Sequence, residues 1–277
     1  MIRGTTRLIA HIGFPTSTFK APMIYNPWFE AQGIDAVVVP MGCKADDYAA
    51  FLPLVFRLSN IHGALITMPH KIATIALADR VSVTARIAGA ANALRLGVDG
   101  ALEADMFDGE GFVLGVLAKG QRLDGIGALV VGAGGVGSAI AASLARAGVA
   151  RLAIFDPNAA AAQALAGRLL AAYPALRVET GSRDPAGFEL VVNASPLGMN
   201  ADDPMPMDVT RIDPAAFVGE VVMKAEMTPF LAAAAERGCR YQVGTDMLFE
   251  QIPAYLEFFG FGKPTADELR RTAAISY

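Results

Sequence analysis

A glycine-rich run near the middle of the chain constrains its fold more than any other feature. Residues 129–137 read L-V-V-G-A-G-G-V-G, with a strand pattern before them and a helical pattern, Ser138–Ala147, after them. Gly132, Gly134 and Gly137 form G-x-G-x-x-G: the first allows a tight turn, the second lets the backbone approach a pyrophosphate, and the third permits close helix–strand packing. Because a helix N-terminus also offers N–H groups to phosphates, the run predicts a Rossmann dinucleotide-binding domain.

An acidic residue follows at the place where such a site meets the adenosine ribose. A second strand pattern, Arg151–Phe155, ends at Asp156, about 24 residues after the first glycine. A carboxylate there accepts hydrogen bonds from the ribose hydroxyls and repels a 2′-phosphate, which favours NAD as the cofactor over NADP. Two alternatives stay open: the glycines serve only to pack a helix on a strand, or Asp156 caps the next helix.

The same glycines decide how a long uncharged stretch is interpreted. Gly125–Ala145 carries no charge over about 21 residues, near the length that spans a bilayer. The glycines in its middle would each weaken a helix by roughly 1 kcal/mol relative to Ala, so a strand, a turn and a buried helix explain it better. The apolar run after Met1 is too short for a secretory signal. We therefore expect no membrane partner and a mature chain that begins near Met1.

Composition and charge exclude further classes of protein. The chain has 277 residues, of which 53% are hydrophobic and 18% charged, so it can bury a sizeable core, and its length favours two domains. Its 23 Lys and Arg against 27 Asp and Glu give a net charge of −4 without a basic block, which argues against a nucleic-acid partner. Cys43 and Cys239 form no C-x-x-C pair and suit reduced thiols. A cytoplasmic monomer or homodimer is expected.

Short apolar runs alternate with Ala-rich helical stretches, a rhythm typical of parallel sheets built from βαβ units. The expected strands are Leu8–Gly13, Ala36–Pro40, Gly63–Thr67, Ala128–Val131, Arg151–Phe155, Leu190–Asn193, Val218–Met223 and Arg240–Val243. A hairpin over Asn92–Asp108, around Asp99-Gly100, separates the two sheets. We predict an α/β protein with a substrate domain over residues 1–103, a Rossmann domain over 104–246, and a helical tail over 247–277 that packs back on the first domain.

A dehydrogenase also needs a side chain that moves the hydroxyl proton while hydride is transferred. His11, His62 and His70 lack metal-ligand spacing and are expected to be surface or strand-end histidines, so no metal site is predicted. The segment Leu65–Lys71, L-I-T-M-P-H-K, is predicted as a strand running into a helix whose first turn holds Lys71.

Several motifs together resemble those of the shikimate dehydrogenase family. Besides the glycine run and Leu65–Lys71, they are G-F-P at Gly13–Pro15, G-A-A-N-A-L at Gly89–Leu94, D-M-F-D-G-E-G-F at Asp105–Phe112, N-A-S-P-L-G-M at Asn193–Met199 and G-T-D-M-L-F-E-Q at Gly244–Gln251. They follow the family's order over nearly the whole chain. The resemblance implies a substrate domain followed by a Rossmann domain, and chemistry like that of aromatic amino acid biosynthesis.

The resemblance also implies roles for individual residues. The family's catalytic lysine and aspartate correspond to Lys71 and Asp108, which would act as the proton-transfer pair. Thr67, Asn92 and Gln251 correspond to positions that hydrogen-bond the substrate. The residues expected at the cofactor are Gly132, Ala133, Gly134, Gly135, Val136, Gly137, Asp156, Asn193, Ala194, Ser195, Met223, Gly244 and Met247.

The match fails where the family holds its substrate. Two serines that bind the substrate carboxylate correspond to Phe19 and Ala21, and the asparagine of N-V-T corresponds to Leu65. N-T-D has a phenylalanine, Phe107, in place of its threonine, and the tyrosine beside the nicotinamide corresponds to Met223. Because each lost donor removes ~1–3 kcal/mol, a buried shikimate carboxylate would be left unpaired. The substrate is therefore expected to differ from ordinary shikimate.

The sequence thus predicts an NAD(P)-dependent dehydrogenase that uses NAD and acts on the hydroxyl or ketone of a small cyclic hydroxy acid or polyol. Two alternatives remain: a non-catalytic NAD-binding sensor that kept the fold, or a true shikimate or quinate dehydrogenase with an altered carboxylate anchor. Ser17, Thr18 and Lys20 are the nearby side chains that could replace the missing serines.

Overall fold

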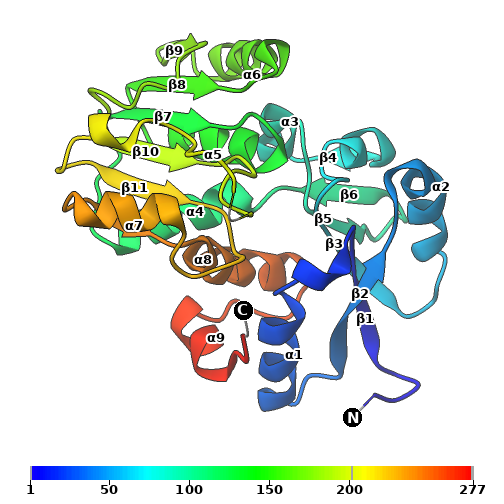
Figure 1. Cartoon of the computed structure of the whole chain (residues 1–277). Coiled ribbons are helices and arrows are strands. Elements are labelled where there is room, and N and C mark those ends of the chain that lie inside the picture. The colour runs from blue at the N-terminus through cyan, green and yellow to red at the C-terminus, as the bar shows by residue number, and fades with distance from the viewer. Residues whose placement is uncertain (1, 201, 276–277) are drawn as a thin grey trace. The chain divides into compact units, whose positions relative to one another are not determined.

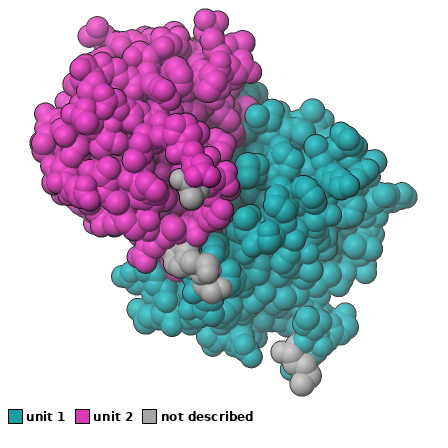
Figure 2. Space-filling model, in the orientation of Figure 1, with its two compact units in different colours: residues 1–86, 90–107, 252–276 teal, residues 87–89, 108–251, 277 magenta. Residues whose placement is uncertain are grey.

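The computed structural model describes residues 2–200 and 202–275, which form two compact units (Figure 2). Unit 1 holds the chain up to Arg86, Ala90–Phe107 and the segment from Ile252; unit 2 holds Ile87–Gly89 and Asp108–Gln251. The structure therefore divides the chain after Phe107 and Gln251, where the sequence suggested divisions after residues 103 and 246. Both units are α/β, and the helical tail from Ile252 belongs to unit 1 as expected.

Unit 2 is built on a sheet in which every neighbouring pair of strands runs parallel (Figure 1). The strand order is β12-β11-β10-β7-β8-β9. The bounds are β7 Gly127–Val131, β8 Arg151–Phe155, β9 Arg177–Thr180, β10 Leu190–Asn193, β11 Phe217–Glu220 and β12 Arg240–Gln242. The strand β9 was not predicted, because R-V-E-T is mostly polar and lies exposed at the edge of the sheet.

Helices cover both faces of this sheet. They are α4 Asp108–Ala118, α5 Gly135–Arg146, α6 Ala159–Ala172, α7 Pro229–Glu236 and the first part of α8 Gly244–Phe258, with the 3-10 helix η3 Val209–Arg211. Side chains alternate along each strand, so Val130 packs with α4, α5 and α6 on one face, while Leu129 packs with α7 on the other. The helix α5 begins at Gly135, three residues before the predicted start at Ser138, because the glycine loop enters its first turn.

Unit 1 contains a mixed sheet of order β2-β1-β3-β5-β6-β4. Its strands are β1 Arg7–Gly13, β2 Ala36–Gly42, β3 Ile61–Ile66, β4 Arg80–Val81, β5 Ala93–Leu96 and β6 Leu102–Asp105. The predicted hairpin is confirmed as the antiparallel pair β5–β6. The predicted parallel pairing is confirmed for β2-β1-β3. The prediction that the hairpin separates the two sheets is wrong, because β5 pairs antiparallel with β3 and extends the sheet of unit 1.

The helices of unit 1 are short. They are α1 Pro22–Ala31, α2 Ala45–Val55, α3 Val83–Ala88 and α9 Ala266–Thr272, with the 3-10 helices η1 Thr16–Thr18 and η2 Ala73–Leu77. The last residues of α3, from Ile87, are assigned to unit 2, whereas the last part of α8, from Ile252, is assigned to unit 1. The helix expected to hold Lys71 in its first turn does not form. Instead the chain makes a turn in which the His70 N–H donates to the Thr67 carbonyl at 3.0 Å, and only η2 follows.

Both cysteines, Cys43 and Cys239, are buried and unbridged, as the sequence suggested. The uncharged stretch Gly125–Ala145 forms β7, the glycine loop and most of α5. Within residues 2–200 and 202–275, no helix has the length and apolar character needed to cross a membrane.

Candidate functional site

The glycine loop of unit 2 joins β7 to α5, and its glycines serve different purposes. Gly132 has a φ of 110°, and a Cβ there would lie 2.6 Å from the Ala194 carbonyl oxygen. At Gly137 a Cβ would overlap the Gly132 carbonyl, so helix and strand approach too closely for any side chain. At Gly134 a Cβ would meet nothing within 4 Å, and its φ of −71° suits any residue. Neither packing nor backbone geometry therefore explains Gly134.

Open space at Gly134 fits the approach of a pyrophosphate. Gly134 is the N-cap of α5 and supplies no side-chain cap, so the N–H groups of the first turn, which includes Gly135 and Val136, are available to an anion. Asp156 lies against the same loop, because its Oδ2 accepts a hydrogen bond from the Ala133 N–H at 2.7 Å. Its Oδ1 accepts from the Asn158 N–H at 2.8 Å. The residues of this loop thus fit a dinucleotide.

The alternative in which Asp156 caps the next helix is not what the structure contains. The N-cap of α6 is Asn158, whose side chain accepts a hydrogen bond from the Ala161 N–H at 3.3 Å. Asp156 instead fastens the start of that segment to the glycine loop.

Other residues expected at the cofactor gather at the carboxyl ends of the same strands. Ala194 adjoins Gly132 and Gly137, and the Met223 Cγ would lie 3.0 Å from a Cβ at Gly244. The Asn193 Oδ1 accepts hydrogen bonds from the N–H and the hydroxyl of Ser195.

Met247 differs from this group. Its side chain is 3% exposed and belongs to the apolar core that it shares with Phe112 of α4.

The glycines of D-G-E-G bring neighbouring helices close to α4. A Cβ at Gly109 would overlap the Ala139 carbonyl of α5, and one at Gly111 would lie 2.6 Å from the Met247 carbonyl and 2.5 Å from the Gln251 Cβ. Gln251 is buried, and its Oε1 has no hydrogen-bond partner among the described residues. This close packing fixes the backbone of a predicted substrate residue beside the first turn of α4.

In unit 1 the predicted substrate residues converge at the carboxyl ends of β1 and β3. The two strands run parallel with Ile12 opposite Ile66, so Gly13 and Thr67 leave the sheet together. A Cβ at Gly13 would overlap the Thr67 methyl and lie 3.0 Å from the Phe19 Cζ. Glycine is therefore required for this convergence.

Backbone hydrogen bonds connect Lys71 with the strand that follows α3. The Ala91 N–H donates to the Lys71 carbonyl at 2.8 Å, and the Ile66 N–H donates to the Asn92 carbonyl at 2.8 Å. The Asn92 side chain is fully buried; its Oδ1 accepts from the Phe107 N–H at 3.0 Å, while its Nδ2 has no partner in the described part of the chain. A buried donor without an acceptor is costly, so Asn92 is suited to bind a ligand oxygen.

Four of the residues that depart from the family's pattern, Phe19, Ala21, Leu65 and Phe107, have apolar side chains whose surroundings the structure shows. The Phe19 ring stacks on His11 with centroids 4.1 Å apart, and Ala21 is buried just before α1. Leu65 is buried in β3, and Phe107 packs edge-on against Tyr255 with centroids 4.8 Å apart. Ala21, Leu65 and Phe107 are thus buried and Phe19 is half-buried, and none of these side chains supplies a hydroxyl.

The expectation of surface or strand-end histidines is wrong for His11 and His70, which are both buried. His11 lies inside β1, which has a neighbour on each side, so the strand has no exposed edge there. Burial, and next the positive charge of Lys71, lower the pKa of His11 to about 3. His70 stacks on Tyr48 at 4.0 Å and its Nε2 bonds the Cys43 carbonyl at 2.8 Å. His11 is therefore a neutral group near a cationic Lys71.

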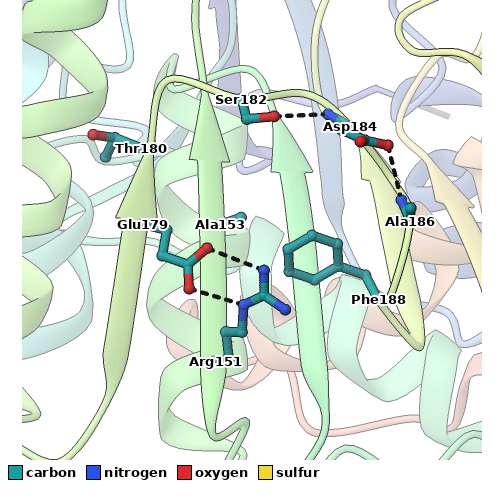
Figure 3. A pocket seen from close by; sticks show the side chains of 8 residues that line it. All are labelled: Arg151, Ala153, Glu179, Thr180, Ser182, Asp184, Ala186 and Phe188. Atoms are coloured by element: carbon teal, nitrogen blue, oxygen red, sulfur yellow. Dashed lines mark hydrogen bonds and ion pairs between the residues drawn. The ribbon is translucent and has the colours of Figure 1, made fainter.

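A pocket of about 200 Å³ lies elsewhere in unit 2, beside β8 and β9 (Figure 3). The connection from β9 to β10 contains no helix, so this part of the sheet is bordered by Phe188 and the preceding loop. The Arg151 guanidinium lies 4.2 Å from the Phe188 ring centroid and pairs with Glu179 at 2.9 Å. Asp184, the other charged residue that lines the pocket, pairs with Arg211 at 2.7 Å, and none of the residues predicted for the site lines the pocket.

One buried carboxylate was missed by the sequence reasoning. Glu220 ends β11, is fully buried, and hydrogen-bonds the side chains of Asn193 and Thr228. An acidic residue inside the apolar run F-V-G-E-V-V was the available signal, because an unpaired charge is rarely placed in a buried strand.

Comparisons with known proteins agree with this arrangement. The model of the shikimate dehydrogenase substrate binding domain matches residues 12–94, and that of the ThiF family matches residues 114–171. The first match includes Thr67 and Lys71, which follow β3, and the second begins in α4 and covers the glycine loop.

Individual relatives match over nearly their whole length. The shikimate dehydrogenase (NADP(+)) of Acidiphilium cryptum is 36% identical over 276 residues, 99% of this chain and 98% of that protein. The quinate dehydrogenase from Corynebacterium glutamicum, solved with NAD, is 30% identical with a TM-score of 0.84, covering 96% of this chain and 98% of that one. The 5-ketofructose reductase of Gluconobacter sp. strain CHM43 shares the fold, with a TM-score of 0.85 at 23% identity and 98% of each chain covered. This chain belongs to the shikimate dehydrogenase family.

Proposed function

We propose that the protein is an NAD-linked oxidoreductase that interconverts the hydroxyl and ketone of a small cyclic hydroxy acid or polyol other than shikimate. The observation that carries the proposal is the pattern of polar and apolar groups in unit 1. Thr67, Lys71 and Asn92 are retained, and the buried amide donor of Asn92 lacks a partner among the residues that the structure describes. Phe19 and Ala21 offer no hydroxyl to a carboxylate.

Lys71 and Asp108 are the proposed proton-transfer pair. When bound, the nicotinamide would accept or supply the hydride. Lys71 would take up or release the hydroxyl proton, and Asp108 would accept a hydrogen bond from that hydroxyl and hold the ammonium in place. Within unit 1 the backbone of Lys71 is connected to the Asn92 segment, since the Lys71 carbonyl accepts a hydrogen bond from the Ala91 N–H and the Asn92 side chain accepts one from the Phe107 N–H.

The cofactor is proposed to be NAD, although the relative from Acidiphilium cryptum is named for NADP(+). Asp156 follows β8 and bonds the glycine loop at Ala133, so a 2′-phosphate on the adenosine ribose would approach a carboxylate. The quinate dehydrogenase from Corynebacterium glutamicum, whose structure holds NAD, supports this choice.

We expect NAD⁺ to bind about ten-fold more tightly than NADP⁺, because the repulsion between the like charges costs on the order of 1.4 kcal/mol. The dissociation constants would be measured by calorimetry. Asp156→Ser should narrow or reverse the ratio, whereas Glu236→Gln, which removes an exposed charge from the end of α7, should leave it unchanged. Equal or tighter NADP⁺ binding by the parent protein would show that Asp156 does not line the ribose pocket.

The substrate is tested by restoring the missing hydroxyls. NAD⁺ reduction would be assayed over a panel of cyclic polyols and hydroxy acids that includes shikimate and quinate. Phe19→Ser combined with Ala21→Ser should raise kcat/KM for shikimate by about five-fold per recovered hydrogen bond, that is ~1 kcal/mol each. Phe14→Ser adds a hydroxyl at the exposed phenylalanine nearby and should have no such effect. High activity of the parent protein on shikimate would contradict the altered substrate.

A further inference from the structure

A carboxylate inside the sheet of unit 2 connects two loops at the carboxyl ends of its strands. Glu220 is fully buried at the end of β11. Its Oε1 accepts a hydrogen bond from the Asn193 Nδ2 at 2.6 Å, and its Oε2 accepts one from the Thr228 hydroxyl. Burial raises the pKa of Glu220, while these two hydrogen bonds act in the opposite direction. Both oxygens are thus committed to neutral donors on separate segments of the chain.

On the β10 side, the carboxylate orders the loop that follows Asn193. The Asn193 Nδ2 also donates to the Leu197 carbonyl at 2.9 Å, and its Oδ1 accepts from the Ser195 N–H at 3.1 Å and the Ser195 hydroxyl at 2.6 Å. Gly198 has a φ of 98°, and a Cβ there would lie 3.5 Å from the Glu220 Oε1. Residues 194–198 are therefore folded around Asn193 and directly over the carboxylate.

On the β11 side, the carboxylate holds the segment that leads to α7. Thr228 is the N-cap of α7, and its hydroxyl accepts from the Leu231 N–H at 3.2 Å while donating to Glu220. Residues 221–228 therefore begin directly after Glu220 and end at Thr228, whose hydroxyl donates a hydrogen bond to the Glu220 carboxylate. Within that segment, Val222 lies against Gly244, where a Cβ would overlap the Val222 carbonyl.

Residues 194–198 and 221–228 follow strands on one side of β7, and Asp156, the carboxylate expected at the adenosine ribose, follows the strand on the other side. In the sheet, β10 and β11 flank β7 on one side, and β8, which precedes Asp156, flanks it on the other. A dinucleotide with its adenosine ribose at Asp156 and its pyrophosphate at Gly134 extends its nicotinamide half toward β10 and β11. The segments held by Glu220 are the ones that this half would meet.

We propose that Glu220 is a positioning residue that holds residues 194–198 and 221–228 in the shape that receives the nicotinamide half of the cofactor. This inference rests on the proposed dinucleotide function. Glu220 itself is fully buried and acts through Asn193 and Thr228.

The test compares two ligands that share the adenosine half. NADH and ADP binding would be measured by calorimetry in the parent protein, in Glu220→Gln and in the exposed control Glu236→Gln. Glu220→Gln replaces one acceptor oxygen by an amide donor that faces Asn193 or Thr228, so the two loops lose their common anchor. We expect NADH to bind at least ten-fold more weakly, and ADP to bind within two-fold of the parent. The control should match the parent protein for both ligands.

A second pair of variants keeps the test independent of whether Glu220→Gln folds. Thr228→Val removes the hydroxyl and keeps the shape, whereas Thr228→Ser keeps the hydroxyl, so only the first should lose NADH affinity selectively. Equal weakening of both ligands, or none, would overturn the positioning role, because a general loss of structure does not distinguish the halves of the cofactor. A parent protein that binds neither ligand would overturn the proposed function as well.

Discussion

Replacement of Lys71 by alanine is expected to lower kcat by about 10²–10⁴-fold on the true substrate, the range that general acid–base groups contribute. The dissociation constant for NADH should stay within two-fold of the parent value. The reason is the location of each function: Lys71 lies in the turn after β3 in unit 1, and the glycine loop lies after β7 in unit 2. Rapid-mixing kinetics with saturating substrate would measure the first quantity and calorimetry the second.

Three further variants define what the lysine does. Lys71→Arg keeps the positive charge but cannot release its proton near neutral pH. If Lys71 transfers a proton, kcat of Lys71→Arg should therefore be as low as that of Lys71→Ala. Asp108→Asn should lower kcat as well, and combining it with Lys71→Ala should cost less than the product of the single effects, because paired residues act as a unit. Lys44→Ala, an exposed lysine just before α2, is the control. A Lys71→Ala protein that turns over substrate at the parent rate would refute the proposed relay.

The Rossmann half of the fold could be predicted because its determinants are local. The strand, the glycine spacing and the helix are adjacent in sequence, and Gly132 and Gly137 are required by the backbone contacts at that turn. Asp156 follows from the same local pattern one strand later. The edge strand β9 could not be predicted in this way, because an exposed strand buries too little apolar surface to leave a clear pattern.

The candidate site of unit 1 could be predicted only as separate residues. Their convergence depends on the register of β1 against β3 and on the addition of the β5–β6 hairpin, which no local pattern encodes. The segment that holds Lys71 is predicted as the first turn of a helix, whereas the hydrogen bond from the His70 N–H to the Thr67 carbonyl closes a turn there instead. Glu220 was missed for a related reason: its partners, Asn193 and Thr228, come from other segments.

Acid is expected to destabilise unit 1 through His11. In the unfolded chain this imidazole has a pKa of 6.5, and in the folded protein burial and the charge of Lys71 lower its pKa to about 3. Between these values the unfolded chain binds the extra proton, so stability is fully present above about pH 6.5 and is lost as pH falls toward 3. Between pH 7 and pH 5 the loss amounts to about 2 kcal/mol of unfolding free energy.

The measurement can be restricted to unit 1. Trp28 is the chain's single tryptophan and is buried in α1, so its fluorescence in urea reports the unfolding of that unit. In His11→Phe the ring that stacks on Phe19 remains and the titrating nitrogens are gone. The loss of stability from pH 7 to pH 5 should therefore be about 2 kcal/mol smaller than in the parent protein.

A second variant separates the two causes of this pKa. Burial is the larger and Lys71 the smaller, so Lys71→Met should raise the pKa of His11 and reduce the acid-induced loss only in part. Titration of His11 by NMR would report the same shift directly. Identical pH dependence in the parent protein and in His11→Phe would mean that His11 is not the group responsible. Identical dependence in the parent and in Lys71→Met would mean that the ammonium lies too far from the imidazole, and the position inferred for the proton-transfer lysine would have to be abandoned.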